Sequence, residues 1–260
     1  MAQNIRELYR FRELLISWTF RELRLRYKQS LLGGLWAIVQ PVVLMFLFVL
    51  VFSVFVRLPT DGIPYPIFAY TALLPWTYFA TSLTFSVPSL VTNMNLVTKI
   101  YFPREILPLA SIGAALVDFS IASSVLIVLM LYYRIPFYIT LLWVPVLILA
   151  QTIFVAGVAL FASMLNAFFR DVRFMIPLAV QAWMYATPII YPLSAVPDWL
   201  RPFYLLNPMA GIIDSYRRVI LKGLPPDPVA LGLAFGMAVI MLLIGYIYFK
   251  RSERVLPDVI

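Results

Sequence analysis

Asp118 is the one ionisable side chain inside the predicted membrane-spanning stretches of this 260-residue sequence. A carboxylate in the middle of a bilayer is costly, so such a residue is a candidate for a functional role. Three roles fit it: joining helices or subunits through hydrogen bonds, gating a pathway, or carrying a proton. The first would use the nearby hydroxyls of Ser111, Ser120, Ser123 and Ser124. Proton transfer usually needs several titratable groups, and the predicted spans hold no second one.

The rest of the side-chain inventory offers little for catalysis or metal binding. The sequence has no cysteine and no histidine, which removes disulfides, thiolate sites and the commonest metal ligand and general base. It also lacks a carboxylate cluster and the phosphate-binding loop G-x-x-x-x-G-K-[ST]. We therefore expect no catalytic residue, no metal site and no cofactor bound by this chain. Energy for any active transport would come from another protein.

The composition is that of an integral membrane protein. Hydrophobic residues make up 63% of the chain and charged residues only 12%, whereas soluble domains are about a quarter charged. The net charge of +8 could indicate nucleic-acid binding. However, the basic residues flank apolar stretches, where they have a topological role, so we expect membrane lipid and not nucleic acid as the partner.

Charge-free intervals predict six transmembrane helices, because a charge at mid-bilayer costs about 2.5–3.5 kcal/mol. We place them near 31–56, 67–90, 107–132, 140–165, 174–191 and 229–249. The predicted cytoplasmic segments hold 14 Lys and Arg residues and the outer segments six, which predicts that both termini are cytoplasmic. The predicted fold is an all-α integral membrane protein with one six-span domain over 31–260.

Three segments flank or connect the spans. Residues 1–30 are basic with apolar residues at helical spacing, which predicts a cytoplasmic amphipathic interface helix that is either an anchor or a docking site for a partner. The loop NLVTKIYFPREILP, with Pro103, Arg104 and Glu105, could form a short helix parallel to the membrane. Between spans five and six, 192–228 predicts two short helices joined at Asn207-Pro208. They are re-entrant, or rest on the outer interface, or cap the surface without a transport role.

Aromatic and amide side chains in spans one and five could line a route for a sugar chain, because flat rings with polar edges stack on sugars. Span five also contains Pro177, Pro188 and Pro192, so it should kink, either as a channel wall or in ordinary buried packing. For any single aromatic residue, the alternative is packing or the interfacial belt. The channel candidates are Trp36, Phe46, Phe52, Phe55, Gln181, Trp183, Tyr185 and Tyr191.

Four motifs, in order, resemble the permease subunits of bacterial ATP-binding-cassette polysaccharide exporters of the O-antigen, teichoic acid and capsule type. They are YKQSLLGGLWAIVQP (27–41), KIYFPREILPLA (99–110), FFRDVRF (168–174) and LNPMAGIIDSYRRVIL (206–221). The resemblance covers nearly the whole chain.

The resemblance implies a homodimer in the bacterial inner membrane that exports lipid-linked polysaccharide with two copies of a cytosolic ATPase, which would bind ATP and Mg. Segment 91–105 would be the coupling loop, with Tyr101, Pro103, Arg104 and Glu105 nearest the ATPase. Helices within 197–222 would be outer gate helices, and spans one and five would enclose the channel. Alternatives are an ATP-driven exporter of a drug or lipid, a membrane-embedded glycan-modifying transferase, and a passive channel.

Overall fold

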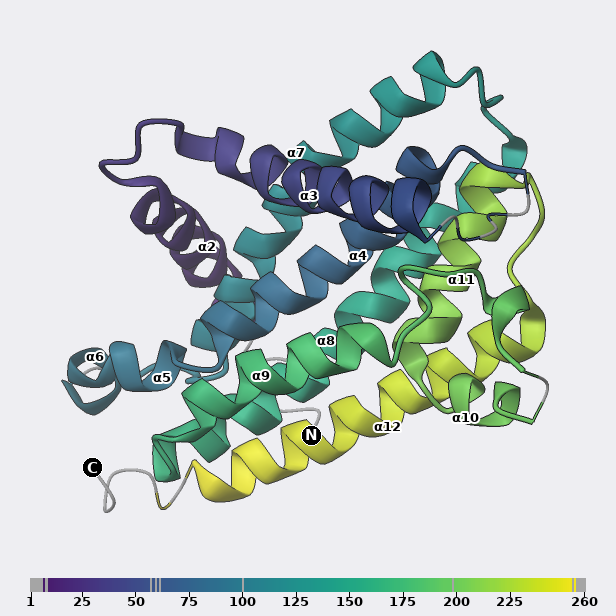
Figure 1. Cartoon of the computed structure of the whole chain (residues 1–260). Coiled ribbons are helices and arrows are strands. Elements are labelled where there is room, and N and C mark those ends of the chain that lie inside the picture. Colours follow the sequence, from purple (N-terminus) through teal and green to yellow (C-terminus); the bar gives the residue numbers. More distant parts are fainter. Residues whose placement is uncertain are drawn as a thin grey trace.

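The computed structural model describes residues 7, 9–56, 58, 60, 62–99, 101–197, 199–253 and 255, so parts of the predicted 1–30, 91–105 and 197–222 segments lie outside the described residues. Within the described part of the chain the regular structure is entirely helical (Figure 1). The helices are α2 (Arg12–Tyr27), η1 (Gly33–Leu35), α3 (Trp36–Phe48), the π-helix η2 (Val49–Phe55), α4 (Tyr65–Ser86), α5 (Ser89–Thr92), α6 (Met94–Lys99), α7 (Ile106–Tyr132), η3 (Ile139–Trp143), α8 (Val144–Phe168), α9 (Val172–Tyr185), η4 (Leu193–Ala195), α10 (Arg201–Leu205), α11 (Pro208–Leu221) and α12 (Pro228–Ser252).

Among the described residues, four helical stretches are long and apolar enough to cross a membrane. They are Gly33–Phe55, Ile106–Tyr132, Ile139–Phe168 and Pro228–Ser252. Their bounds agree closely with four of the expected spans, those near 31–56, 107–132, 140–165 and 229–249. An all-helical membrane protein is therefore confirmed, whereas the full count of six spans stays a prediction.

The other two expected spans correspond to α4 and α9. Helix α4 has 22 residues, but many of them are tyrosine, threonine and serine. Helix α9 has only 14 residues, which is about 21 Å at 1.5 Å per residue and shorter than a hydrocarbon layer of about 30 Å. It ends at Tyr185, ahead of Pro188, because a proline disfavours helical geometry in the residue before it and supplies no N–H.

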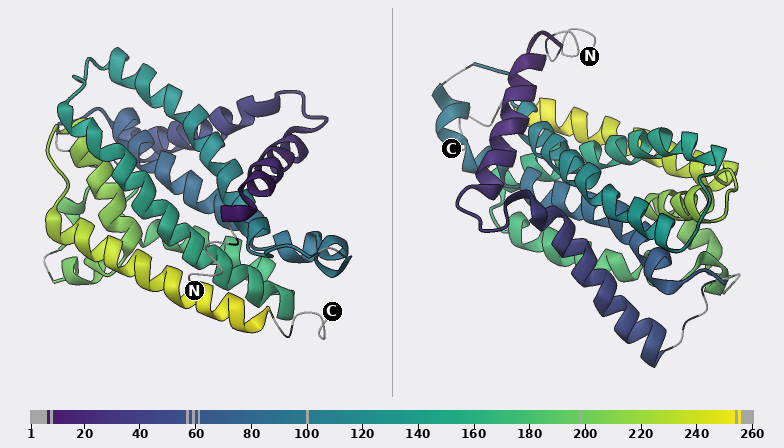
Figure 2. Two further views of the ribbon diagram at one scale, coloured as in Figure 1. Left: turned by 180° about the vertical axis from the view of Figure 1, so that it is seen from behind. Right: turned by 90° about the horizontal axis from the view of Figure 1, so that it is seen from above.

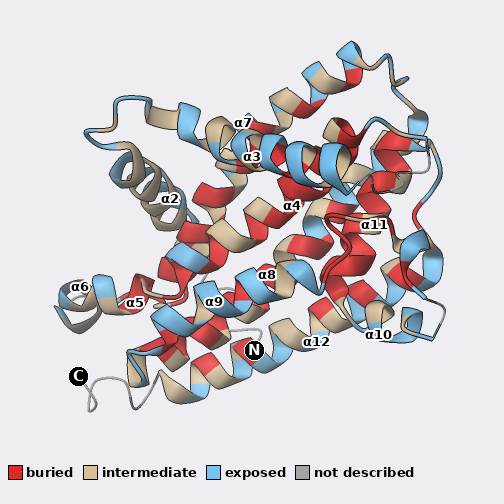
Figure 3. Ribbon diagram, viewed as in Figure 1, coloured by how far each residue is buried: buried red, intermediate tan, exposed pale blue. Residues whose placement is uncertain are grey.

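Helix α4 lies at the centre of the bundle, and several of its polar groups form hydrogen bonds there. Figure 3 shows it mostly buried between α3 and α9. The Tyr70 hydroxyl donates to the Ala122 carbonyl over 2.9 Å, and the Tyr78 and Thr152 hydroxyls lie 2.9 Å apart. The Gln151 amide donates to the Pro75 carbonyl over 2.6 Å. A helix that packs against protein on most sides can carry such groups, because protein partners replace the water that lipid cannot supply.

Small residues let α8 and α12 pack closely. A Cβ added at Gly157 would lie 2.5 Å from the Leu242 backbone nitrogen, and one added at Gly245 would overlap the Gly157 carbonyl oxygen. Ala234 and Ala238 continue the buried face of α12. Small residues of this kind are typical of helix pairs in membranes, where close backbone approach supplies the packing energy.

The bundle has two ends that differ in what gathers there (Figures 1 and 2). At the first, the α2 end, α2, α5 and α6 lie beside the start of α7 and the end of α12. At the second, the α11 end, α10, α11 and η3 lie beside the starts of α4 and α12. Every long helix runs between these two ends, and α9 starts from the α2 end.

Candidate functional site

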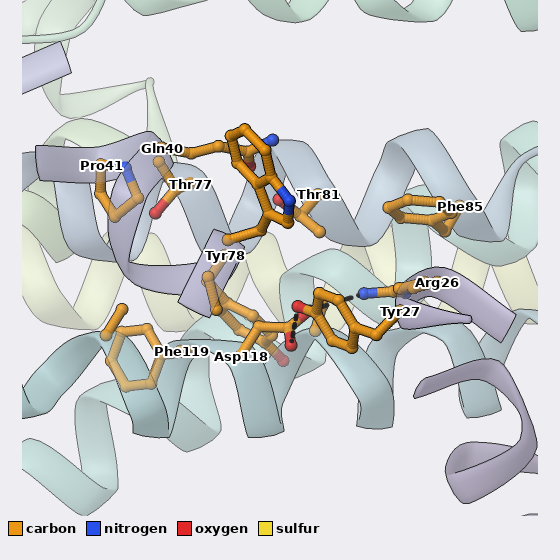
Figure 4. Close-up of a pocket in the computed structure, with 14 residues that line it drawn as sticks. Arg26, Tyr27, Gln40, Pro41, Thr77, Tyr78, Thr81, Phe85, Asp118 and Phe119 are labelled. Carbon is orange, nitrogen blue, oxygen red and sulfur yellow. Dashed lines mark hydrogen bonds and ion pairs between the residues drawn. The ribbon is translucent and has the colours of Figure 1, made fainter. Parts of the chain in front are cut away.

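Asp118 forms a buried ion pair with Arg26 at the end of α2. Arg26 Nη1 donates to Asp118 Oδ2 over 2.8 Å, and the Tyr27 hydroxyl donates to Asp118 Oδ1 over 2.7 Å (Figure 4). The side chains of Arg26 and Asp118 are only 6% and 13% exposed. Asp118, the one charged residue of α7, is thus paired with Arg26, which lies 92 residues earlier in the sequence.

Arg26 is held by further contacts that fix its position. Its Nη2 donates to the Ser111 carbonyl over 3.0 Å, and its guanidinium lies 3.8 Å from the centre of the Phe85 ring. Burial lowers the pKa of Arg26, and the charge of Asp118 opposes that shift. Because two helices of the bundle and α2 all contribute, the guanidinium ties the end of α2 to both α4 and α7.

The serines expected around Asp118 have other partners. The Ser111 hydroxyl donates to Leu107, and those of Ser120, Ser123 and Ser124 also donate to carbonyls of their own helix, α7. The observed geometry favours the helix-joining role among the three considered for Asp118. Its use in gating or proton transfer is untested.

A cavity of about 200 Å³ opens beside the ion pair. It lies between α2, α3, α4 and α7, and Figure 4 shows the side chains that surround it. Trp36, Gln40, Thr77 and Thr81 line it together with the ion pair. Trp36, one of the channel candidates, therefore lines a cavity of mixed polar and apolar residues at the start of α3.

The predicted coupling residues lie at the α2 end. Tyr101 is 82% exposed, and its hydroxyl donates to Glu7 Oε1 over 3.0 Å, which raises the Tyr101 pKa. The next residue, Phe102, stacks on Trp18 of α2 with ring centres 6.3 Å apart. Tyr101 thus presents a surface that a partner can reach.

Arg104 and Glu105 instead join this segment to α12. Arg104 Nη1 donates to the Glu253 carbonyl over 2.8 Å, and buried Glu105 accepts from Lys250 Nζ over 2.7 Å. Lys250 also pairs with the Glu253 carboxylate at 3.0 Å. The role of Arg104 and Glu105 in coupling stays a prediction, and local sequence spacing does not indicate these partners some 145 residues away. Pro103 lies in the turn that precedes α7, where the Ile106 N–H donates to its carbonyl.

The channel candidates divide into two groups. Phe46, Phe55, Gln181 and Tyr185 are exposed on α3, η2 and α9, and Trp36 is partly exposed where it lines the cavity beside the ion pair. The others turn inward: Phe52 packs edge-on against Phe48, the Trp183 indole N–H donates to Asn207 Oδ1 over 3.1 Å, and the Tyr191 hydroxyl lies 2.5 Å from that of Tyr204. The exposed group is the one that can contact a second chain or a substrate.

In the segment after α9, Arg217 of α11 acts as an anchor. It is only 4% exposed, although the sequence placed it among the outer charges. Its guanidinium donates to the carbonyls of Pro188, Ile189 and Tyr191 and lies 3.6 Å from the centre of the Phe68 ring. It thereby fixes α11 against α4 and the chain that follows α9. Among the described residues, no group of three carboxylate, histidine or cysteine side chains has a metal-binding arrangement.

Comparison with known proteins decides the family. Residues 13–221 match the family described as ABC-2 type transporter. The chain belongs to the ABC-2 type transporter family. This ABC-2 chain is 34% identical over 246 residues to the O-antigen export system permease protein RfbA of Myxococcus xanthus, with 93% of each chain covered. It is 31% identical over 224 residues to the protein of the same name in Klebsiella pneumoniae, with 86% of this chain and 85% of that one covered.

A more distant relative is the polysialic acid transport protein KpsM of Escherichia coli. It is 24% identical over 244 residues, which cover 90% of this chain and 91% of that one. These matches confirm the family resemblance that the four sequence motifs indicate. They also confirm that the ABC-2 chain is a membrane transport protein.

Removing either partner of the Arg26–Asp118 pair should destabilise the fold. Arg26→Gln and Asp118→Asn should each cost about 3–5 kcal/mol in free energy of unfolding, because each leaves a buried charge without its partner. The double variant should cost clearly less than the sum of the two. The measurement is SDS titration of the purified protein in mixed micelles, followed by circular dichroism.

Arg24→Gln is the matched control, because Arg24 is an exposed arginine on the same helix. It should change the free energy of unfolding by less than about 0.5 kcal/mol. Single variants of the ion pair that are as stable as the Arg24→Gln protein would show that the pair does not hold α2 in place.

Proposed function

We propose that this chain is the transmembrane subunit of an ATP-driven exporter that moves lipid-linked polysaccharide, such as an O-antigen, across the bacterial inner membrane. The observation that carries the proposal is the 34% identity, over 93% of both chains, to an O-antigen export system permease. The exposed aromatic residues of α3, η2 and α9 support it, because they offer stacking surfaces without fixed charge.

In this proposal two copies of the chain enclose the route, and their α3 and α9 helices line it. These two helices flank α4 on one face of the bundle, and both expose large apolar side chains there (Figure 3). A second copy placed by a two-fold axis would bring α3 of one copy near α9 of the other. Helices α4 and α9 would then complete six spans, with both termini in the cytoplasm.

The α2 end would face the cytoplasm and dock a separate ATPase that binds ATP and Mg. Segment 91–105 would be the coupling loop there, and α10 and α11 would form the outer gate. That loop leads directly into α7, and contacts of Arg104 and Glu105 link it to the end of α12. ATP-driven closure of the ATPase would therefore move these helices and widen the route, so that the glycan advances sugar by sugar.

Tyr101 is the sharpest probe of this docking. Tyr101→Ala should lower export and the ATPase activity stimulated by this chain about tenfold, as expected for loss of an aromatic contact at an interface. The fold should be retained because the ring is exposed. Tyr132→Ala removes an exposed tyrosine at the end of α7 far from the α2 end and is the control. Equal activity of the two variants would contradict docking at Tyr101.

The exporter proposal is tested by depleting the chain in its host and measuring lipid-linked polysaccharide on each side of the inner membrane. We expect accumulation on the cytoplasmic side and loss from the cell surface, both restored when the chain is re-expressed. Unchanged surface glycan would contradict the proposal and would favour export of a drug or lipid. Glycan modification by the purified chain without an ATPase would instead indicate a transferase.

A further inference from the structure

The cavity beside the Arg26–Asp118 pair presents polar groups that the bundle itself does not use. It has a volume of about 200 Å³ and lies within a single copy of the chain, between α2, α3, α4 and α7. The route proposed above lies elsewhere, between two copies, so no step of export described so far needs this cavity.

Helical spacing brings the polar side chains of the cavity together. Trp36 and Gln40 lie four residues apart on α3, and Thr77 and Thr81 lie four residues apart on α4, so each pair shares one face of its helix. All four line the cavity. Figure 4 shows Gln40 and the two threonines along one side of it and Phe119 of α7 along the other.

Several hydrogen-bonding groups of the lining have no partner. Within the described part of the chain, the Trp36 indole N–H, the Gln40 amide and the Thr81 hydroxyl make no hydrogen bond. Arg26 is only 6% exposed, and its buried Nε likewise has no acceptor among the described residues. A buried donor without an acceptor costs free energy, which a ligand with matching oxygen atoms would recover.

The charge and the size of the cavity limit what it can hold. Arg26 and Asp118 are the charged residues of the lining, and they neutralise each other at 2.8 Å, so an uncharged ligand is favoured. A cavity of about 150 Å³ admits benzene, whereas drug-sized ligands occupy about 300–1,000 Å³. A volume of about 200 Å³ therefore suits a single six-membered ring with small substituents.

We propose that this cavity binds one uncharged sugar residue. A sugar ring carries hydroxyls, which match the unpartnered donors and acceptors, and apolar C–H faces, which pack on aromatic rings. Trp36, Tyr78, Phe85 and Phe119 supply such rings in the lining. The inference rests on the proposed function for the source of the sugar, which would be the exported glycan. The cavity adjoins the end of α2, so it would hold that residue near the cytoplasmic side.

The test is saturation-transfer NMR of the purified full-length chain in lauryldimethylamine oxide, a detergent without a sugar headgroup. The probes are free D-glucose, D-galactose, D-mannose, L-rhamnose and N-acetyl-D-glucosamine, each titrated to obtain a dissociation constant. We expect saturable binding of at least one of these sugars.

Variants of the lining should weaken this binding. Thr81→Val keeps the side-chain shape and should raise the dissociation constant about fivefold, the usual net effect of one uncharged hydrogen bond, and Gln40→Leu should do the same. Trp36→Leu should raise it about tenfold through loss of the stacking ring. The matched controls lie outside the cavity: Thr84→Val on the exposed side of α4, and Trp199→Leu, whose ring is 70% exposed. Neither should change the constant.

Thr81 distinguishes this cavity from the route between copies, because it belongs to α4 and not to α3 or α9. Binding that Trp36→Leu weakens and Thr81→Val does not would place the sugar on the route and overturn the cavity site. No saturable binding of any of the five sugars, or equal weakening by the controls, would also overturn it. The titration needs neither an ATPase nor export, so its failure is distinguishable from failure of the exporter proposal.

Discussion

The arrangement of the α2 end of the bundle depends on the buried pair of Arg26 and Asp118. A single carboxylate within α7 would be expensive in lipid, and a single guanidinium at the end of α2 would be equally so. Together, with the Tyr27 hydroxyl and the Ser111 carbonyl, they satisfy most of each other's polar atoms. The pair therefore specifies where α2 ends and which face of α7 it meets.

Other contacts at the α2 end extend the same attachment. Thr19 of α2 packs so closely on Gly113 of α7 that an added Cβ there would lie 2.9 Å from its hydroxyl oxygen. Trp18 stacks on Phe102, and the residues that follow join α12 through Lys250 and Glu253. Three segments distant in sequence, α2, the stretch from Phe102 into α7, and the end of α12, are thus linked into one surface. A protein that docks there would act on α7 and α12 together.

The sequence could predict what depends on composition and local pattern. The apolar intervals gave four spans whose bounds agree with the helices, and Asp118 stood out as the residue that needed an explanation. The motifs led to the correct family. The short α9 was less predictable, because its charge-free interval continues past Tyr185 while prolines end the helix.

Side-chain partners could not be predicted, since they come from distant parts of the chain. Arg26 looked like one cation among many in a basic segment, and Arg217 looked like an exposed outer charge. Glu105 is predicted to lie near a partner ATPase, yet it is buried against Lys250. Trp183 turns inward because its indole N–H donates to Asn207. Asn207 lies beyond the end of α9, so the spacing within that helix does not indicate this partner. Local spacing carries no information about such contacts.

The claim that two copies enclose the route between α3 and α9 has a direct test, because the chain contains no cysteine. Phe46 and Tyr185 are 63% and 58% exposed. They lie about 15 and 20 Å along helices that both start from the α2 end, so a two-fold axis along the membrane normal would bring them to similar depth. The measurement is disulfide cross-linking in native membranes between differently tagged copies that carry Phe46→Cys and Tyr185→Cys. We predict a cross-linked pair of the two tags, and no cross-link when Ile240→Cys on α12 replaces either one. Equal cross-linking through α12, or none through Phe46 and Tyr185, would contradict the account.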